Sequence, residues 1–118
     1  MKAEIIQAIK DTGLAVYMRN INDTYAYFTD GVHIGYIQED KGFMEGISIS
    51  TVHIPCHECG TGYNLEKHLE VKDLTEERLE HAFINAPSWA TRSSYVKKWR
   101  NMEHFLTKDS WNAGFKEV

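Results

Sequence analysis

The order of hydrophobic and polar positions predicts a short helix followed by strands. Ile5, Ile6 and Ile9 recur at helical spacing, and Gly13 follows as a residue that commonly ends helices. We therefore expect an amphipathic helix over residues 2–12. Beyond it the pattern changes to runs of β-branched and aromatic residues, which predict four strands at 14–18, 24–28, 32–37 and 47–52.

Short connections predict that strands adjacent in the chain are also adjacent in the sheet. Asp30-Gly31 suits a tight hairpin turn, because glycine and, to a lesser degree, aspartate tolerate a positive φ. The connections at 20–23 and 40–45 are also short and rich in turn residues. The simplest topology is a four-stranded antiparallel meander.

Two further helices are expected to cover this sheet. Thr75 is a suitable N-cap for a helix over 76–84, and Leu74 and Leu79 stand at the spacing of a hydrophobic staple. An apolar stripe then predicts a helix over 92–107. We expect residues 1–118 to form a single α+β domain, in which an N-terminal helix and two C-terminal helices pack on the four-stranded sheet.

Composition agrees with one globular domain and excludes several classes of protein. The chain has 118 residues, 42% of them hydrophobic and 25% charged, which leaves no room for a catalytic domain with a separate regulatory domain. No apolar run approaches the roughly 20 residues that a membrane helix requires, and the N-terminus lacks the hydrophobic stretch of a signal peptide. These features predict a cytoplasmic protein that makes no membrane contact.

Charge is unevenly distributed along the chain. Residues 1–84 contain 7 basic and 14 acidic side chains, whereas residues 85–118 contain 6 basic and 3 acidic ones. Lys97 and Arg100 fall on the polar side of the expected C-terminal helix and are candidates for contacts with nucleic-acid phosphates. The alternative is that they form the ordinary solvent-facing side of an amphipathic helix.

The segment with the most distinctive chemistry is a loop that contains both cysteines. Cys56 and Cys59 form a C-x-x-C pair, and His53 and His68 would complete a tetrahedral zinc site. The two histidines lack the spacing of a second ligand pair, so the absence of any cofactor is the favoured interpretation and zinc is the alternative. In a symmetric dimer, the two cysteines of each chain could together form an all-thiolate site. Redox catalysis is disfavoured, because the residues around the pair are typical of a loop rather than a helix N-terminus.

Residues around this loop also resemble a known group of proteins. Ser50–Pro55 (STVHIP), followed by Gly60–Tyr63 (GTGY), resembles a stretch of small uncharacterised proteins of tailed bacteriophages. The resemblance implies a phage origin, and hence the host cytoplasm, but it implies no activity and no site residues.

The aromatic strand residues are candidates for an interaction surface. Tyr25, Tyr27, Phe28 and Tyr36 exceed what one core face readily holds, so those that lie outward, with Tyr25, Tyr27 and Tyr36 as the candidates, mark a protein-binding or dimer surface. The alternative is cross-strand aromatic pairing beneath the helices.

Catalytic motifs do not appear in the sequence. A nucleophile with a base, a glycine-rich phosphate loop and an H-E-x-x-H motif are all missing. The leading hypothesis is therefore a small non-enzymatic interaction protein, a phage accessory or host-modulating factor that binds another protein or itself. The alternatives are a zinc-stabilised nucleic-acid-binding protein and a small enzyme with an unrecognised site.

Overall fold

The computed structural model describes residues 1–31, 33–51, 64–84 and 114–118. Its α-helices are α1 (Ala3–Asp11) and α2 (Glu76–Ile84), and its 3-10 helices are η1 (Gly42–Met44) and η2 (Val71–Asp73). Its strands are β1 (Ala15–Met18), β2 (Tyr25–Thr29), β3 (Ile34–Asp40), β4 (Gly46–Thr51), β5 (Asn64–Leu69) and β6 (Lys116–Glu117).

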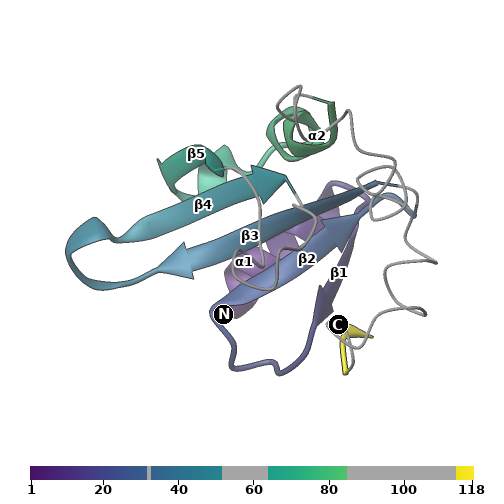
Figure 1. The fold of residues 1–118 in the computed structure, drawn as a ribbon, viewed down its shortest axis with the longest axis horizontal. Helices are drawn as coiled ribbons and strands as arrows, with labels where there is room; N and C mark the ends of the chain where they lie inside the picture. Colours follow the sequence, from purple (N-terminus) through teal and green to yellow (C-terminus); the bar gives the residue numbers. More distant parts are fainter. Residues whose placement is uncertain (32, 52–63, 85–113) are drawn as a thin grey trace, which may run out of the picture.

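These strands form one antiparallel sheet in the order β5-β4-β3-β2-β1-β6 (Figure 1). The predicted meander is present as β1 to β4, and the α+β class is confirmed. The predicted number of four strands is wrong, because β5 extends the sheet beyond β4 and β6 extends it beyond β1. Strand β6 has only two residues and pairs with Tyr17 and Met18.

The described residues contain two α-helices rather than the three expected. Helix α1 lies within the predicted range, and α2 coincides with its prediction. The backbone N–H of Arg78 donates to Oγ1 of Thr75 at 3.3 Å, which is the expected N-cap contact. The predicted helix over 92–107 falls outside the residues that the structure describes.

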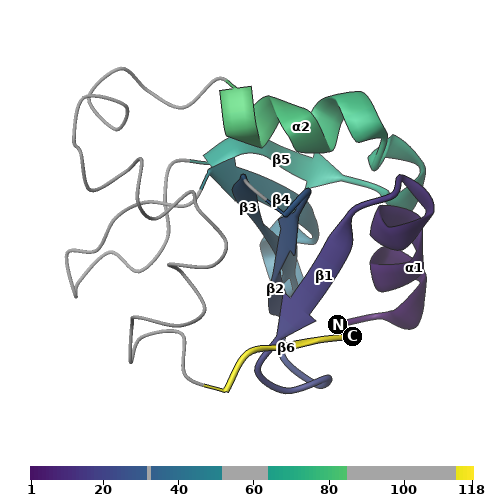
Figure 2. The same ribbon diagram turned by 90° about the vertical axis from the view of Figure 1, so that its right-hand side faces the viewer.

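Both helices pack on the same side of the sheet (Figure 2). The inward side chains of the strands alternate with outward ones, so this side receives an almost continuous apolar surface. At its centre the ring of Phe28 lies over Gly35, its partner on the neighbouring strand. A Cβ atom on Gly35 would be 2.2 Å from the Phe28 ring, so only glycine leaves space for the ring here. The core contains Ile5, Ile6, Ile9, Leu14, Val16, Met18, Ala26, Phe28, Ile37, Ile47, Ile49, Leu69, Leu74, Leu79, Ala82 and Phe83.

The connection between β2 and β3 is the predicted hairpin turn. Gly31 has a φ of 98°, which is the left-handed region that glycine tolerates. The Asp30 carboxylate accepts a hydrogen bond from the backbone N–H of His33 at 2.7 Å. This turn fixes the register in which Tyr27 faces Tyr36.

Among the described residues, neither helix has the length and hydrophobicity that a transmembrane segment would need.

Candidate functional site

The three tyrosines predicted as an interaction surface lie together on the sheet. Tyr27 and Tyr36 are direct cross-strand partners with ring centroids 5.5 Å apart, and the Tyr25 ring stacks on Tyr36 at 5.8 Å. Phe115, just before β6, contacts Tyr27 at 5.0 Å. Because the neighbouring Ala26 points into the core, this cluster occupies the sheet face opposite the helices. Cross-strand aromatic pairing is therefore present on the face opposite α1 and α2, and the predicted cover by a helix over 92–107 lies outside the described residues.

Two of these tyrosines are almost completely buried. Tyr27 keeps 4% of its surface exposed and Tyr36 keeps 8%, whereas Tyr25 and Phe115 are half-buried. Burial, reinforced by the neighbouring Tyr25 and by Asp40, raises the pKa of Tyr36 to about 12, and burial raises the pKa of Tyr27 still further. Both phenols are thus neutral at physiological pH. The accessible part of the cluster is limited to Tyr25 and Phe115.

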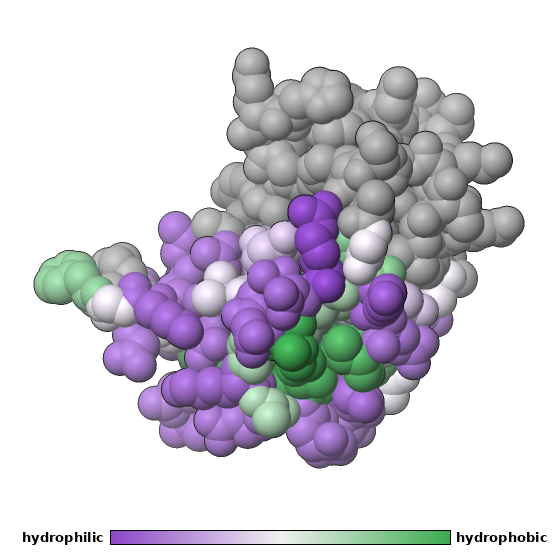
Figure 3. Space-filling view, turned by 90° about the horizontal axis from the view of Figure 1, so that it is seen from below, coloured by the Kyte–Doolittle hydropathy of each residue, from purple (hydrophilic) through white to green (hydrophobic). Residues whose placement is uncertain are grey.

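A different aromatic residue is fully exposed. Phe43 lies in η1, at the end of the β3–β4 hairpin, and its side chain makes no covering contact. The other described phenylalanines are buried or half-buried. Figure 1 shows this hairpin extending beyond the rest of the sheet, and Figure 3 shows hydrophobic atoms projecting from the same end of the molecule. Among the side chains that the structure describes in this hairpin, Phe43 is the large apolar one presented to the surroundings.

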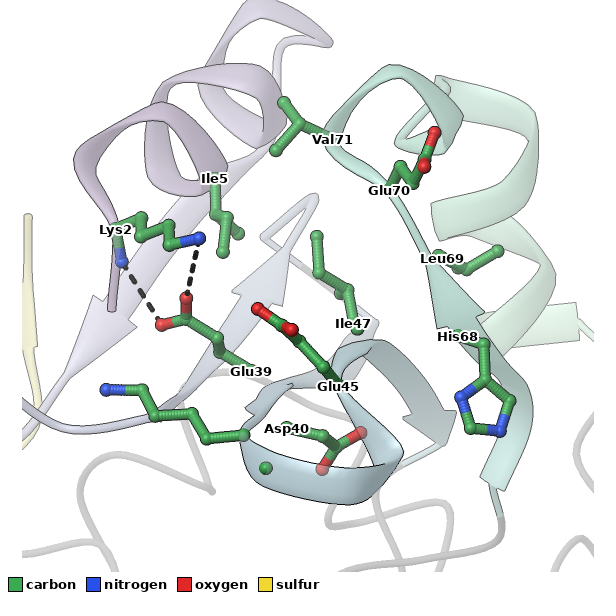
Figure 4. Close-up of a pocket in the computed structure, with 13 residues that line it drawn as sticks. Lys2, Ile5, Glu39, Asp40, Glu45, Ile47, His68, Leu69, Glu70 and Val71 are labelled. Carbon is green, nitrogen blue, oxygen red and sulfur yellow. Dashed lines mark hydrogen bonds and ion pairs between the residues drawn. The ribbon is translucent and has the colours of Figure 1, made fainter.

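A pocket of about 670 Å³ lies beside the connecting end of the same hairpin (Figure 4). It is bounded by the start of α1, the end of β3, the connection to β4 with the start of β4, and the chain that leads from β5 into η2. Its apolar wall consists of Ile5, Ile47, Leu69 and Val71. Its polar wall consists of Lys2, Glu39, Asp40, Lys41, Glu45, His68 and Glu70.

Glu39 is the most buried charged residue of this pocket, with 7% of its surface exposed. Its carboxylate accepts a hydrogen bond from the backbone N–H of Lys2 at 3.4 Å, and the Lys2 Nζ atom lies 3.9 Å from Oε2. Both distances are long for a charge-assisted contact. The neighbouring Asp40 accepts a hydrogen bond from the Ser48 hydroxyl. Figure 4 shows the carboxylates of Glu39 and Glu45 reaching into the space between α1 and η2.

His68, the one described member of the predicted zinc set, lies at the rim of this pocket. The register between β4 and β5 shifts here, so that Ser48 faces two residues instead of one, as in a β-bulge. His68 adopts a φ of 60°, and the backbone of Gly46 approaches it so closely that a Cβ on Gly46 would be 2.8 Å from its Cα. His68 therefore stands at the bulge, outside the regular pairing, and is one of the residues that line the pocket.

The remaining predicted site residues fall outside the described part of the chain. His53, Cys56 and Cys59 belong to 52–63, and Lys97 and Arg100 belong to 85–113. The zinc site and the phosphate contacts therefore stay predictions. Within the described residues, no three side chains of histidine, cysteine, aspartate or glutamate are placed to hold one metal ion.

Sequence reasoning missed both the exposed phenylalanine and the pocket. Phe43 and Met44 form an apolar pair inside a connection that is otherwise polar, and this was the available signal. The pocket has no comparable signal, because its residues come from separate segments around positions 2–5, 39–47 and 68–71. Spacing along the chain cannot show that these segments meet.

Comparison with known proteins gives no family to which the chain can be assigned: no family model, no curated protein and no solved structure matches it. Function must therefore be argued from the geometry of the site itself.

Proposed function

We propose that this protein is a non-enzymatic binding module that contacts a partner protein through the end of the β3–β4 hairpin. The observation that supports the proposal is the complete exposure of Phe43 at the end of that hairpin. Aromatic side chains are enriched in protein interfaces, where burial of one such residue in a partner pocket supplies much of the binding energy.

The hairpin is well suited to hold such an anchor in place. Strands β3 and β4 pair without interruption from Gly35 opposite Thr51 to Asp40 opposite Gly46. Because paired strands hold the backbone on both sides of η1, little backbone freedom is lost when Phe43 binds, which favours affinity. Burying a phenylalanine that is otherwise in water contributes about 2 kcal/mol.

The nature of the partner follows from the surroundings of Phe43. Lys41 and Glu45 flank it, so a complementary site would be an apolar cavity with charged or polar groups at its rim. The local resemblance to tailed-bacteriophage proteins supports a partner encoded by the phage or by its host. A second copy of this chain is the other partner that the sequence suggests. Contacts by the tyrosine cluster and by the loop at 53–62 stay predictions.

The experiment compares three proteins: the wild type, Phe43→Ser, and Ile21→Ser as a matched control. Ile21 is the other exposed large apolar residue of the described chain, and it lies in the connection between β1 and β2. A specific partner captured from host lysate should bind the wild type and Ile21→Ser alike, while Phe43→Ser should weaken its affinity by about 30-fold, or about 2 kcal/mol.

The native mass of each protein, measured alongside, distinguishes self-association from binding to another protein. A partner that binds wild type and Phe43→Ser with equal affinity would contradict the proposal. So would a wild-type protein that binds neither a partner nor itself.

A further inference from the structure

The pocket beside the connecting end of the β3–β4 hairpin has the size and lining of a small-ligand site. Its volume of about 670 Å³ falls within the range of roughly 300–1,000 Å³ that is usual for such sites. One wall is apolar and the other is charged. Four carboxylates (Glu39, Asp40, Glu45 and Glu70) line it against two lysines (Lys2 and Lys41). Glu70 is also paired with Lys72 at 3.1 Å, and the negative charge that remains in excess favours a cation over an anion.

Within this pocket, Glu39 is the carboxylate best placed to bind a cation. More than nine-tenths of the residue is buried, so its carboxylate has lost most of its hydration. Its contacts with Lys2 measure 3.4 and 3.9 Å, whereas a charge-assisted hydrogen bond is ordinarily about 2.7–2.9 Å long. The pocket side of this carboxylate can therefore accept a shorter hydrogen bond from a ligand.

We propose that the pocket binds a small organic cation, an ammonium or guanidinium group carried on a short apolar chain. The cationic group donates to Glu39, and Glu45 supplies a second negative charge nearby (Figure 4). The apolar chain lies against Ile5, Ile47 and Val71. A bare metal ion fits less well, because the described residues contain no group of three metal-ligating side chains and the apolar wall offers no ligand.

Lys2 acts as an internal competitor for this position. Its side chain is 61% exposed, so its ammonium can leave Glu39 for water at little cost. Removal of its charge should consequently strengthen ligand binding, whereas removal of the Glu39 charge should weaken it. Two substitutions in the same ion pair thus have opposite expected effects.

The test is an amide NMR titration of the full chain with three probes: pentylamine, pentanoate and magnesium chloride. Pentylamine, which is protonated at neutral pH, should shift the amide signals of residues 39–47 and 68–71 in a saturable way. Pentanoate has the same number of carbon atoms with the opposite charge, and magnesium carries positive charge without an alkyl chain. Neither should saturate these residues, and preferential binding of pentanoate or magnesium would overturn the proposal.

The variants then locate the site. Glu39→Gln should weaken pentylamine binding on the order of tenfold, and Lys2→Met should strengthen it severalfold. Glu80→Gln, on α2 and away from the pocket, should leave binding unchanged. If Glu39→Gln does not fold, Lys2→Met decides: an affinity that stays the same or falls would overturn the proposal.

Phe43 lies between the pocket residues Gly42 and Glu45 in the sequence, but its own side chain is fully exposed and does not line the pocket. Phe43→Ser should bind pentylamine as the wild type does, so failure of partner binding and failure of ligand binding are separate results.

Discussion

The two faces of the sheet come from the same strands but are built from different side chains. The face that packs against α1 and α2 is mostly aliphatic, with Phe28 fitted over Gly35 at its centre. The opposite face carries tyrosines that pack against one another and against Phe115, with Tyr25 stacked on Tyr36 and the Tyr27 contacts edge-on. One face thus depends on the fit of apolar groups, and the other combines ring packing with hydrogen bonds such as that from the Tyr36 hydroxyl to Gln38.

Because of this difference, the two faces respond differently to changes of side-chain volume and to changes of pH. Close-packed apolar groups tolerate changes of pH but not changes of volume. Buried phenols tolerate loss of a hydroxyl at modest cost, but they cannot ionise without losing their favourable environment. Changes of volume and changes of protonation should therefore separate the two faces in stability measurements.

The largest effect is expected from Phe28→Ala. Phe28 is completely buried between β3 and the α2 residue Phe83, so its truncation should lower the free energy of unfolding by about 3–5 kcal/mol. Tyr25→Ala, on the opposite face, removes a half-buried ring and should cost clearly less. Urea denaturation measures both. Equal losses of stability would show that the two faces contribute alike and would contradict the greater sensitivity of the apolar face to changes of volume.

Gly35→Ala should cost about 1–3 kcal/mol, because the new methyl group would overlap the Phe28 ring. The same substitution in a Phe28→Leu background should cost less, since leucine lacks the ring atoms that a Cβ on Gly35 would meet. A double-mutant cycle measures the coupling between the two positions. Strictly additive losses would mean that the close approach of ring and glycine has no energetic consequence.

Tyr36→Phe should cost about 1 kcal/mol at neutral pH, through loss of the hydrogen bond to Gln38. Its main effect is expected in alkali. Because the pKa of Tyr36 is about 12 in the folded chain against 10.0 for a free phenol, the folded state holds the proton more tightly. The resulting stabilisation is complete below pH 10 and is lost as the pH rises through about 12.

Urea denaturation between neutral and alkaline pH tests this dependence. The variant should lose stability less steeply than the wild type. Tyr27, whose pKa is also raised, should account for part of the slope that remains. Parallel curves for the two proteins would contradict burial as the origin of the raised pKa.

The smallest effect on stability is expected from Phe43→Ser. Because the side chain is fully exposed, its replacement should change the free energy of unfolding by less than about 0.5 kcal/mol. Differential scanning calorimetry can establish this beside the binding measurements. A large loss of stability would instead assign Phe43 a role in folding.

The elements predicted correctly are those whose signals are local. The spacing of Ile5, Ile6 and Ile9 is enough to place α1, and Thr75 marks the start of α2. Strand β5 was missed because Glu66, Lys67 and His68 interrupt its apolar residues, and a β-bulge removes the expected alternation. Strand β6 is too short for any pattern and exists only through its pairing with β1.

The candidate sites differ in the same way: the tyrosine cluster has a local signal in the sequence, whereas the buried Glu39 has none. The three tyrosines could be grouped from the sequence, because Tyr25 and Tyr27 are two residues apart and share one face of β2. Pairing of β2 with β3 then places Tyr36 opposite Tyr27 on that face. This pattern could not show that Tyr27 and Tyr36 would be buried. Glu39 looked like one acid among many, and its burial beside Lys2 depends on a contact across 37 residues of sequence.

Strand β6 illustrates the entropic cost of a distant pairing. Its Glu117 accepts a hydrogen bond from the Tyr17 hydroxyl across 100 residues, whereas β1 to β4 are joined by short turns. Closing a segment on the order of 100 residues costs about 2 kcal/mol more than closing one of about ten. Two strand residues offset little of this, so the ring contacts of Phe115 and the packing of Val118 against the core anchor the final strand. Amide hydrogens of β6 should consequently exchange with solvent well before those between β2 and β3, and local unfolding of the sheet should begin at the β6 edge.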